Sequence, residues 1–262
     1  MRAVILAAGS GTRMNGHTGR APKALLPVGR ESLIQRQLRA LRAAGVDEIA
    51  VVVGCEAALV RQHCGRGITY VENARYAETN SLYSLWLARP LLYDGCIVLN
   101  CDVLFHPQLL TDLLTSRHAC VALVDYPAPD GPPLGDEEMK VRVRGGRIVE
   151  MAKGMAPMDA DGENVGMLRF GTSAVPALVG ILDDVVASGA IREWAPRAFS
   201  LFAANHPLWA IGTRGFPWIE VDFPDDYRRA LDEVLPQIDQ RAAAAPRAPM
   251  VARPLIAGAA GR

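Results

Sequence analysis

A glycine-rich loop near the start of the chain has the residue types that suit phosphate binding. It runs Leu6-Ala-Ala-Gly-Ser-Gly-Thr-Arg-Met14 directly after an apolar run, and its small residues let backbone N–H groups crowd around phosphate oxygens. Arg13 and Lys23 add the positive charge that amide groups lack. Because neither the P-loop pattern nor the full dinucleotide fingerprint is present, we expect a phosphate site of another kind.

Two aspartates follow strand-like runs and could hold a hard cation. Asp102 comes after the apolar run Cys96–Asn100, and Asp222 ends the run that begins at Trp218. Carboxylates at the carboxyl ends of central strands face the ligand cleft, and their oxygens suit Mg²⁺. The alternative is that both aspartates only cap the helices that follow them. Glu220 should share a strand face with Asp222, where it could orient water or substrate.

Lysine is rare in this chain, which has 28 basic residues, and only Lys23, Lys140 and Lys153 are lysines. GC-rich codon usage explains the bias towards arginine. The remaining lysines are still informative, because a compact ammonium can approach a single phosphate oxygen as a point charge. Lys140 has a simpler alternative, which is that it is a solvated strand residue.

Short β-branched runs alternate with helical patterns through the first half, which predicts a parallel sheet covered by helices on both faces. The predicted strands are Ala3–Ala7, Glu48–Val53, Ile68–Val71, Cys96–Asn100 and Cys120–Val124. The predicted helices are Ser32–Ala44, Glu56–His63, Ser81–Ala88 and Pro107–Ser116.

The second half predicts a hairpin, further strands and further helices that complete the sheet and form a lid over its edge. Gly145-Gly146 suits a two-residue hairpin turn. The predicted strands are Lys140–Arg144, Arg147–Met151, Val165–Phe170, Leu208–Ile211 and Trp218–Val221, and the predicted helices are Ser173–Ser188, Ile191–Ala204 and Asp225–Leu235. We expect one domain over residues 1–240 and an Ala/Pro/Arg-rich, disordered tail over residues 241–262.

Overall composition limits the partners. The formal net charge is zero, so it gives no electrostatic case for nucleic acid or for an anionic membrane surface. The apolar runs are shorter than the roughly 18 residues of a membrane span. Five scattered cysteines form no C-x-x-C pair, which favours reduced thiols and a cytoplasmic protein.

The motif L-A-A-G-x-G-T-R-M, followed by P-K-A-L-L-P-V, resembles the signature of nucleotidyltransferases that activate sugar and alcohol phosphates. The resemblance extends to about Leu235. It implies a Rossmann-like single-domain α/β fold with a mostly parallel central sheet flanked by helices, and a small hairpin and helical lid. It also implies catalytic roles for Arg13 and Lys23 on the phosphates, and Mg²⁺ on Asp102 and Asp222. The nucleotide-binding loop would then comprise Leu6, Ala7, Ala8, Gly9, Ser10, Gly11, Thr12 and Arg13, with Lys23 and Asp102 beside it.

The segment Glu72-Asn73 to Thr79-Asn80-Ser81 resembles the branch that contains phosphocholine, inositol-phosphate and phosphonate cytidylyltransferases. This resemblance places Asn80 and Ser81 near the base and favours CTP over UTP or GTP. It implies that Lys153 reaches the acceptor's phosphate. It also places Glu163, in the Gly-Glu-x-x-Gly loop, close to the acceptor.

The head group of the acceptor stays open at this stage. A quaternary ammonium would need aromatic faces, for which Trp194, Tyr126, Trp209 and Trp218 are candidates. An aminoalkyl group would need a carboxylate, such as Glu193 or Asp125. Of the aromatic residues we place Trp194 in the acceptor site, together with Lys153, Glu163 and Glu220.

These expectations together describe Mg²⁺-dependent transfer of CMP from CTP to a small phosphate- or phosphonate-bearing acceptor, with release of pyrophosphate. Two alternatives remain: a sugar-1-phosphate nucleotidyltransferase that uses UTP, GTP or dTTP, and a regulatory protein that senses nucleotide. We expect no nucleic-acid or membrane partner, and we leave open whether two copies form a homodimer.

Overall fold

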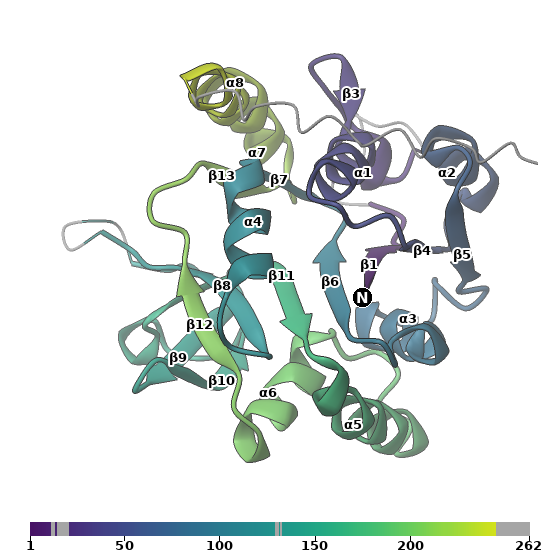
Figure 1. The fold of residues 1–262 in the computed structure, drawn as a ribbon, viewed down its shortest axis with the longest axis vertical. Helices are drawn as coiled ribbons and strands as arrows, with labels where there is room; N and C mark the ends of the chain where they lie inside the picture. The colour runs from purple at the N-terminus through teal and green to yellow at the C-terminus, as the bar shows by residue number, and fades with distance from the viewer. Residues whose placement is uncertain (12–13, 15–20, 129–130, 132, 245–262) are drawn as a thin grey trace, which may run out of the picture.

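A large sheet forms the centre of the protein (Figure 1). The computed structural model describes residues 1–11, 14, 21–128, 131 and 133–244. Within them the sheet has nine strands in the order β5-β4-β1-β6-β11-β8-β12-β10-β9. Its strands are β1 (Arg2–Ala7), β4 (Ile49–Val53), β5 (Ile68–Glu72), β6 (Cys96–Asn100), β8 (Val121–Asp125), β9 (Lys140–Arg144), β10 (Arg147–Ala152), β11 (Gly162–Phe170) and β12 (Trp209–Gly212).

Helices cover both faces of this sheet, as Figure 1 shows. They are α1 (Leu33–Ala43), α2 (Ala57–Cys64), α3 (Ser81–Leu87), α4 (Pro107–Thr115), α5 (Val175–Ala187) and α6 (Pro196–Asn205). Alternate strand residues face opposite sides. Ala3 and Ile5 therefore pack in one apolar cluster with α1, α2 and α4, whereas Val4 and Leu6 pack in another with α3, α5 and α6. This double burial explains why the strand sequences are continuously apolar.

The expected mostly parallel sheet is confirmed, with two reversed strands. Strands β5, β4, β1 and β6 pair in parallel, and so do β8 and β12. Strand β11 lies between β6 and β8 and is antiparallel to both, and β10 is antiparallel to its neighbours β9 and β12. The turn between β9 and β10 has positive φ at both Gly145 (57°) and Gly146 (77°), as a type I′ hairpin requires.

One predicted strand lies outside the central sheet, which corrects our expectation for Asp222. Strand β13 (Trp218–Glu220) pairs antiparallel with β7 (Val103–Phe105) in a separate two-stranded sheet. The helix expected from Ile191 also begins later, at Pro196, because the preceding residues bond to another segment of the chain. Their backbone contacts are described with the site below.

The C-terminal part forms one continuous helical run that extends further than predicted. It comprises α7 (Pro224–Arg229), a π-helical turn η6 (Ala230–Val234) and α8 (Leu235–Ala244). This run packs against β7, β13 and a short hairpin of β2 (Pro27–Val28) and β3 (Glu31–Ser32), where Leu104, Ile219 and Val234 belong to a third apolar cluster. Helix therefore continues to Ala244, and the rest of the predicted tail lies outside the described residues.

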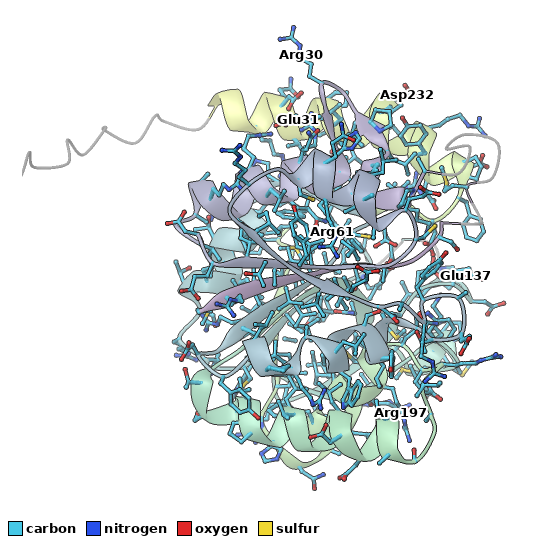
Figure 2. The ribbon with its side chains drawn as sticks, turned by 90° about the vertical axis from the view of Figure 1, so that its right-hand side faces the viewer. Arg30, Glu31, Arg61, Glu137, Arg197 and Asp232 are labelled. Carbon is cyan, nitrogen blue, oxygen red and sulfur yellow. The ribbon has the colours of Figure 1, made fainter. Side chains whose placement is uncertain are left out.

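Charged side chains of both signs are spread over the surface. In Figure 2, Arg30 and Glu31 lie at the top, Arg197 lies near the bottom, and Glu137 lies at one side. Among the described helices, none is both long and apolar enough to cross a membrane.

Candidate active site

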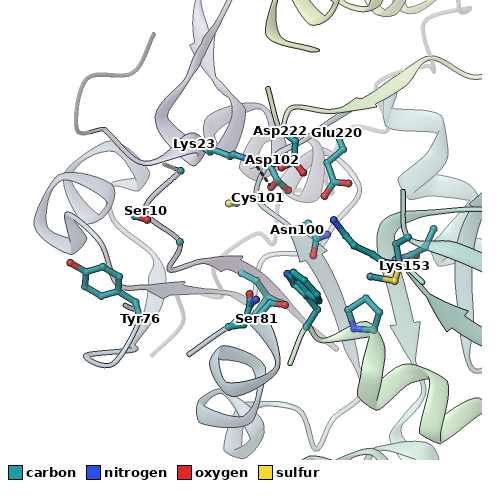
Figure 3. Close-up of a pocket in the computed structure, with 18 of the residues that line it drawn as sticks. Ser10, Lys23, Tyr76, Ser81, Asn100, Cys101, Asp102, Lys153, Glu220 and Asp222 are labelled. Carbon is teal, nitrogen blue, oxygen red and sulfur yellow. Dashed lines mark hydrogen bonds and ion pairs between the residues drawn. The ribbon is translucent and has the colours of Figure 1, made fainter. Parts of the chain in front are cut away.

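A cavity of about 390 Å³ lies at the carboxyl ends of β1 and β6 (Figure 3). This is the position at which ligands bind in open α/β sheets. It is lined by Leu6, Gly9, Ser10, Gly11, Lys23, Tyr76, Thr79, Asn80, Ser81, Asn100, Cys101, Asp102, Met139, Lys153, Asn164, Trp194, Pro196, Glu220 and Asp222. Most residues predicted for the site therefore meet in one cavity.

The glycine loop and Lys23 form one end of the cavity. Gly11 has a φ of +64°, and a Cβ atom there would lie 2.9 Å from Cγ of Lys23. Glycine is thus required both by the backbone conformation and by the close approach of the lysine. Ala7 and Ala8 are buried beneath the loop and do not line the cavity. Thr12 and Arg13 lie outside the described residues, so their roles stay predictions.

Three carboxylates meet beside Lys23. Oxygen atoms of Asp102, Glu220 and Asp222 all lie within 4.8 Å of one another. The pairing of β7 with β13 brings them together, because Glu220 is opposite Val103 and the Val221 N–H donates to the Asp102 carbonyl at 2.9 Å. Asp102 follows a central strand as predicted, whereas Asp222 reaches the site through this small second sheet.

Lys23 compensates part of this negative charge. Its Nζ atom contacts Asp222 and lies 3.8 Å from Oδ2 of Asp102 (Figure 3). Burial, and then the charges of Asp102 and Asp222, raise the pKa of Glu220 well above its usual range. Carboxylate oxygens are hard ligands, and Mg²⁺ is typically held by one or two of them together with phosphate oxygens and water. The residues present therefore fit a divalent cation, with Glu220 as a third candidate ligand that we had placed with the acceptor.

The alternative that both aspartates only cap helices is not what the structure describes. The cap of α4 is His106, whose Nδ1 accepts a hydrogen bond from the Gln108 N–H at 3.1 Å. At the start of α7, Asp226 accepts from the N–H groups of Asp222 and Phe223 at 3.1 and 2.9 Å.

A buried glutamine that the sequence analysis missed braces the turn that carries Asp102. Gln37 of α1 is 1% exposed, and its Nε2 donates to the carbonyls of Asn100 and Val103, both at 2.9 Å. These two carbonyls lie on either side of Asp102. The sequence signal for Gln37 is weak, because a polar residue on an apolar helix face indicates burial without naming its partner.

The segment before α3 lines the cavity, and it is here that we expected the base to bind. Buried Asn73 donates to Thr79 Oγ1 and to Ser84 Oγ, both at 3.0 Å, and Asn80 caps α3 by accepting from the Ser81 N–H at 2.8 Å. Part of the Glu-Asn…Thr-Asn-Ser motif therefore shapes this loop. Tyr76, which belongs to the same motif, also lines the cavity.

Residues from the second half of the chain form the opposite end, where we expected the acceptor. Lys153 follows the β9–β10 hairpin, and Trp194 precedes α6. The Lys153 Nζ atom lies 5.2 Å from the centre of the Trp194 ring and 3.2 Å from a carboxylate oxygen of Glu137. Met139 and Asn164, which we had not assigned to the site, also line the cavity.

Hydrogen bonds tie this end to the loop before α3. The Asn80 N–H donates to the Ile191 carbonyl at 3.0 Å, and the Leu82 N–H donates to the Glu193 carbonyl at 3.2 Å. The Ala195 N–H donates to Ser81 Oγ at 2.9 Å. The loop that carries Trp194 is therefore a turn that precedes the helix, and Ser81 contacts it directly.

Glu163 lies outside the main cavity. It lines an adjoining cavity of about 560 Å³ that shares Glu220 and Asp222 with the first. Burial, and then the nearby carboxylates Glu138 and Asp125, raise the pKa of Glu163 to about 7. Trp218 also lines this second cavity, whereas Trp209 stacks on His118 with ring centres 3.9 Å apart.

Comparison with known proteins gives a consistent result. Residues 3–220 match the family model described as the MobA-like NTP transferase domain. A bifunctional IPC transferase and DIPP synthase of Rubrobacter xylanophilus is 34% identical over 238 residues, which cover 89% of this chain and 52% of that protein. The CMP-5'-(3-aminopropyl)phosphonate synthase of Streptomyces rubellomurinus is 30% identical over 244 residues, covering 88% of this chain and 38% of that protein.

A solved structure shows the same fold. The CTP:phosphocholine cytidylyltransferase of Streptococcus pneumoniae superposes with a TM-score of 0.69 at 22% identity, covering 87% of this chain and 96% of that one. This chain spans about half or less of the length of the two curated relatives above. The family match covers the glycine loop, Lys23, Asp102 and Glu220. The chain therefore belongs to the MobA-like NTP transferase domain family and has the α/β fold of that family.

Proposed function

We propose that the protein transfers CMP from CTP to a small phosphate- or phosphonate-bearing acceptor and releases pyrophosphate. The observation that carries this proposal is the order of groups along one cavity. Figure 3 shows the carboxylates Asp102, Glu220 and Asp222 between Lys23 and Ser10 of the glycine loop on one side and Lys153 on the other, and all of these residues line the cavity. The cavity thus has a cation on each side of a candidate metal site.

The cytidine part of the proposal rests on the relatives and on the base-binding loop. The names of two of the similar proteins specify CMP or CTP. Asn80 lines the cavity, and an amide side chain can pair with both the acceptor and the amino donor on one edge of cytosine.

In this reaction an acceptor oxygen attacks the α-phosphorus, a new P–O bond forms, and the bond to the β-phosphate oxygen breaks. A phosphate monoester has a second pKa of about 6, so its oxygen is already a nucleophile near neutral pH and needs no general base. Catalysis then depends on position and charge. We assign Lys23 to the triphosphate and Lys153 to the acceptor's phosphate.

We assign Mg²⁺ to Asp102 and Asp222, with Glu220 as a third candidate ligand. When bound there, the ion would offset negative charge on the reacting phosphates. Lys23 contacts two of these carboxylates, which holds its ammonium group beside the proposed metal site. All five cysteines are free thiols, which supports a reducing compartment such as the cytoplasm.

The experiment that tests this function is pyrophosphate release with Mg²⁺, using four nucleoside triphosphates and a panel of acceptors. The panel contains phosphocholine, aminoethyl- and hydroxyethylphosphonate, inositol phosphate and several sugar 1-phosphates. We expect release with CTP and an alkyl phosphate, alkyl phosphonate or inositol phosphate. Release only with a sugar 1-phosphate would replace the proposal by the sugar alternative, and nucleotide binding without turnover on any acceptor would favour a regulatory protein.

A further inference from the structure

A lysine side chain lies in the interior of the protein, next to the proposed acceptor site but outside it. Lys140 on β9 is 1% exposed, which makes it one of the largest fully buried side chains among the described residues. Our alternative of a solvated strand residue is therefore wrong. Burying a lysine costs several kcal/mol unless its charge is well compensated, so the position needs an explanation.

The partners of Lys140 are mainly backbone carbonyls. Its Nζ atom donates to the Lys153 carbonyl at 2.8 Å and approaches the Glu138 carbonyl at 3.5 Å. The nearby charge of Glu163 adds a favourable interaction. Methionine would fill a similar volume without the desolvation cost, so stability alone does not account for a charged group here.

The carbonyl that Lys140 holds belongs to the lysine that we assign to the acceptor. Strand β10 ends at Ala152, which pairs with Lys140, and Lys153 is the first residue of the following turn. The Lys153 carbonyl is thus one residue beyond the ladder, and the Lys140 amine supplies its hydrogen bond.

The segment of residues 137–140 also contacts the side chain of Lys153. Its Nζ atom pairs with Glu137, which lies next to Glu138, and also lies over the Trp194 ring. The side chain enters the cavity from the side opposite Ser10 and Tyr76 (Figure 3). Movement of this backbone would displace the Lys153 ammonium from the cavity.

We propose that Lys140 is a positioning residue for the acceptor site, because it fixes the backbone of Lys153 and thereby holds the Lys153 ammonium in the cavity. This inference rests on the proposed function only for the identity of the bound group, an acceptor phosphate or phosphonate. The positioning itself is independent of turnover.

The first test therefore uses fluorescence rather than activity. The Trp194 emission is isolated as the difference between each protein and the same protein with Trp194→Phe. We expect Lys140→Met to shift this difference spectrum as Lys153→Met does, because both variants remove the cation from the ring. The control Arg142→Met removes a cation from the same strand that pairs instead with Glu150, and should leave the spectrum unchanged. A wild-type spectrum in Lys140→Met would overturn the inference.

The second test is a double-mutant cycle on the KM for the acceptor found in the panel above. We expect Lys140→Met and Lys153→Met each to raise this KM about tenfold or more, since small displacements of a binding group have large effects. The KM for CTP should change less than about twofold, and the double variant should be no worse than Lys153→Met alone. Additive effects, or equal losses for both substrates, would show that Lys140 is only structural.

Lys140→Gln, which keeps an N–H donor on a shorter side chain, guards against a variant that fails to fold. We expect it to fold and to give an intermediate spectrum and KM. If neither variant folds, Lys140 is a structural residue and the inference is wrong. If wild type turns over no acceptor, the proposed function fails, while the fluorescence comparison still decides the role of Lys140.

Discussion

At the scale of single residues, the site is dominated by the repulsion among three carboxylates. Asp102, Glu220 and Asp222 are crowded, and Lys23 compensates their charge only in part. Burial, and then the charges of the two aspartates, raise the pKa of Glu220, so the crowding adds to the effect of burial on this group. Such clusters of perturbed groups in a cleft are typical of functional sites. The repulsion among the carboxylates lowers the stability of the folded protein. A bound divalent cation would offset it.

Asp102→Asn should separate function from stability. We expect turnover at saturating Mg²⁺ to fall on the order of 10²-fold or more, because the variant removes a metal ligand and its charge. Without Mg²⁺, the melting temperature should be equal to or higher than that of wild type, since one repulsive charge has gone. The measurements are pyrophosphate release and thermal unfolding with EDTA. Full Mg²⁺-dependent activity in this variant would remove Asp102 from the proposed metal site.

Glu163 should make the stability of the protein depend on pH. Its pKa in the folded protein is about 7 against an ordinary value of 4.5, so the folded state holds a proton that the unfolded state releases. The resulting stabilisation is complete below about pH 4.5 and is lost as pH rises through about 7. The loss is on the order of 3 kcal/mol.

Urea unfolding without metal, repeated across this pH range, measures this effect. Glu163→Gln should make that decline smaller than in wild type, because the amide cannot titrate, while the contribution of Glu220, whose pKa is also raised, remains. Glu150→Gln, at an exposed glutamate on β10, is the matched control and should keep the wild-type dependence. Equal pH profiles for wild type and Glu163→Gln would contradict the assignment of the raised pKa to this group.

At the scale of elements, local pattern and long-range pairing differ in what they allow one to predict. The position of Asp102 was predictable because it directly follows β6, whose apolar run marks a central strand. The route by which Asp222 reaches the site was not, because the pairing of β13 with β7 joins segments more than 100 residues apart. Lys140 could not be recognised as buried for a related reason. Its burial depends on the neighbours of β9 in the sheet, which the alternation within one strand does not reveal.

Gln37 gives a test of how an element supports the site. Gln37→Leu keeps the approximate volume but leaves the carbonyls of Asn100 and Val103 without their donor. An unsatisfied buried polar group costs about 1–3 kcal/mol, so we expect a loss of stability of at least that size. The Mg²⁺ concentration for half-maximal activity should rise about tenfold, since groups that orient metal ligands typically change affinity by 10- to 100-fold.

The control for this prediction is Gln108→Leu, which removes a helical glutamine whose partner is Asp112. Its Mg²⁺ dependence should match that of wild type. If Gln37→Leu loses stability but keeps the wild-type Mg²⁺ dependence, the glutamine supports α1 and the sheet without orienting Asp102.

At the scale of the whole molecule, the two halves of the chain contribute opposite ends of one cavity. The first half supplies the glycine loop, Lys23 and Asp102, and the second supplies Lys153 and Trp194. The family resemblance assigned the first group to the nucleotide and the second to the acceptor; the structure brings both groups into one cavity, and the assigned roles stay predictions. The resemblance did not predict the backbone contacts between the base-binding loop and the loop before α6, which depend on three-dimensional packing. These contacts link the loops that line the proposed nucleotide and acceptor ends of the cavity.

The C-terminal helical run packs behind the proposed metal site. Ile238 on α8 is 5% exposed and belongs to the same apolar cluster as Ile219, the neighbour of Glu220. Removal of residues 236–262 should therefore cost about 2–5 kcal/mol, the usual range for loss of a large buried aliphatic side chain. Because Ile219 loses a packing partner, this truncation should also raise the Mg²⁺ concentration needed for half-maximal activity.

Removal of residues 245–262 alone should leave both properties unchanged, because this segment is rich in Ala, Pro, Arg and Gly and has few bulky apolar groups. Denaturant unfolding and Mg²⁺ titration of the two truncated proteins measure the difference. If the shorter truncation is as damaging as the longer one, the domain does not end near residue 240. In that case residues 245–262 contribute to the fold, and the domain extends beyond the predicted end at residue 240.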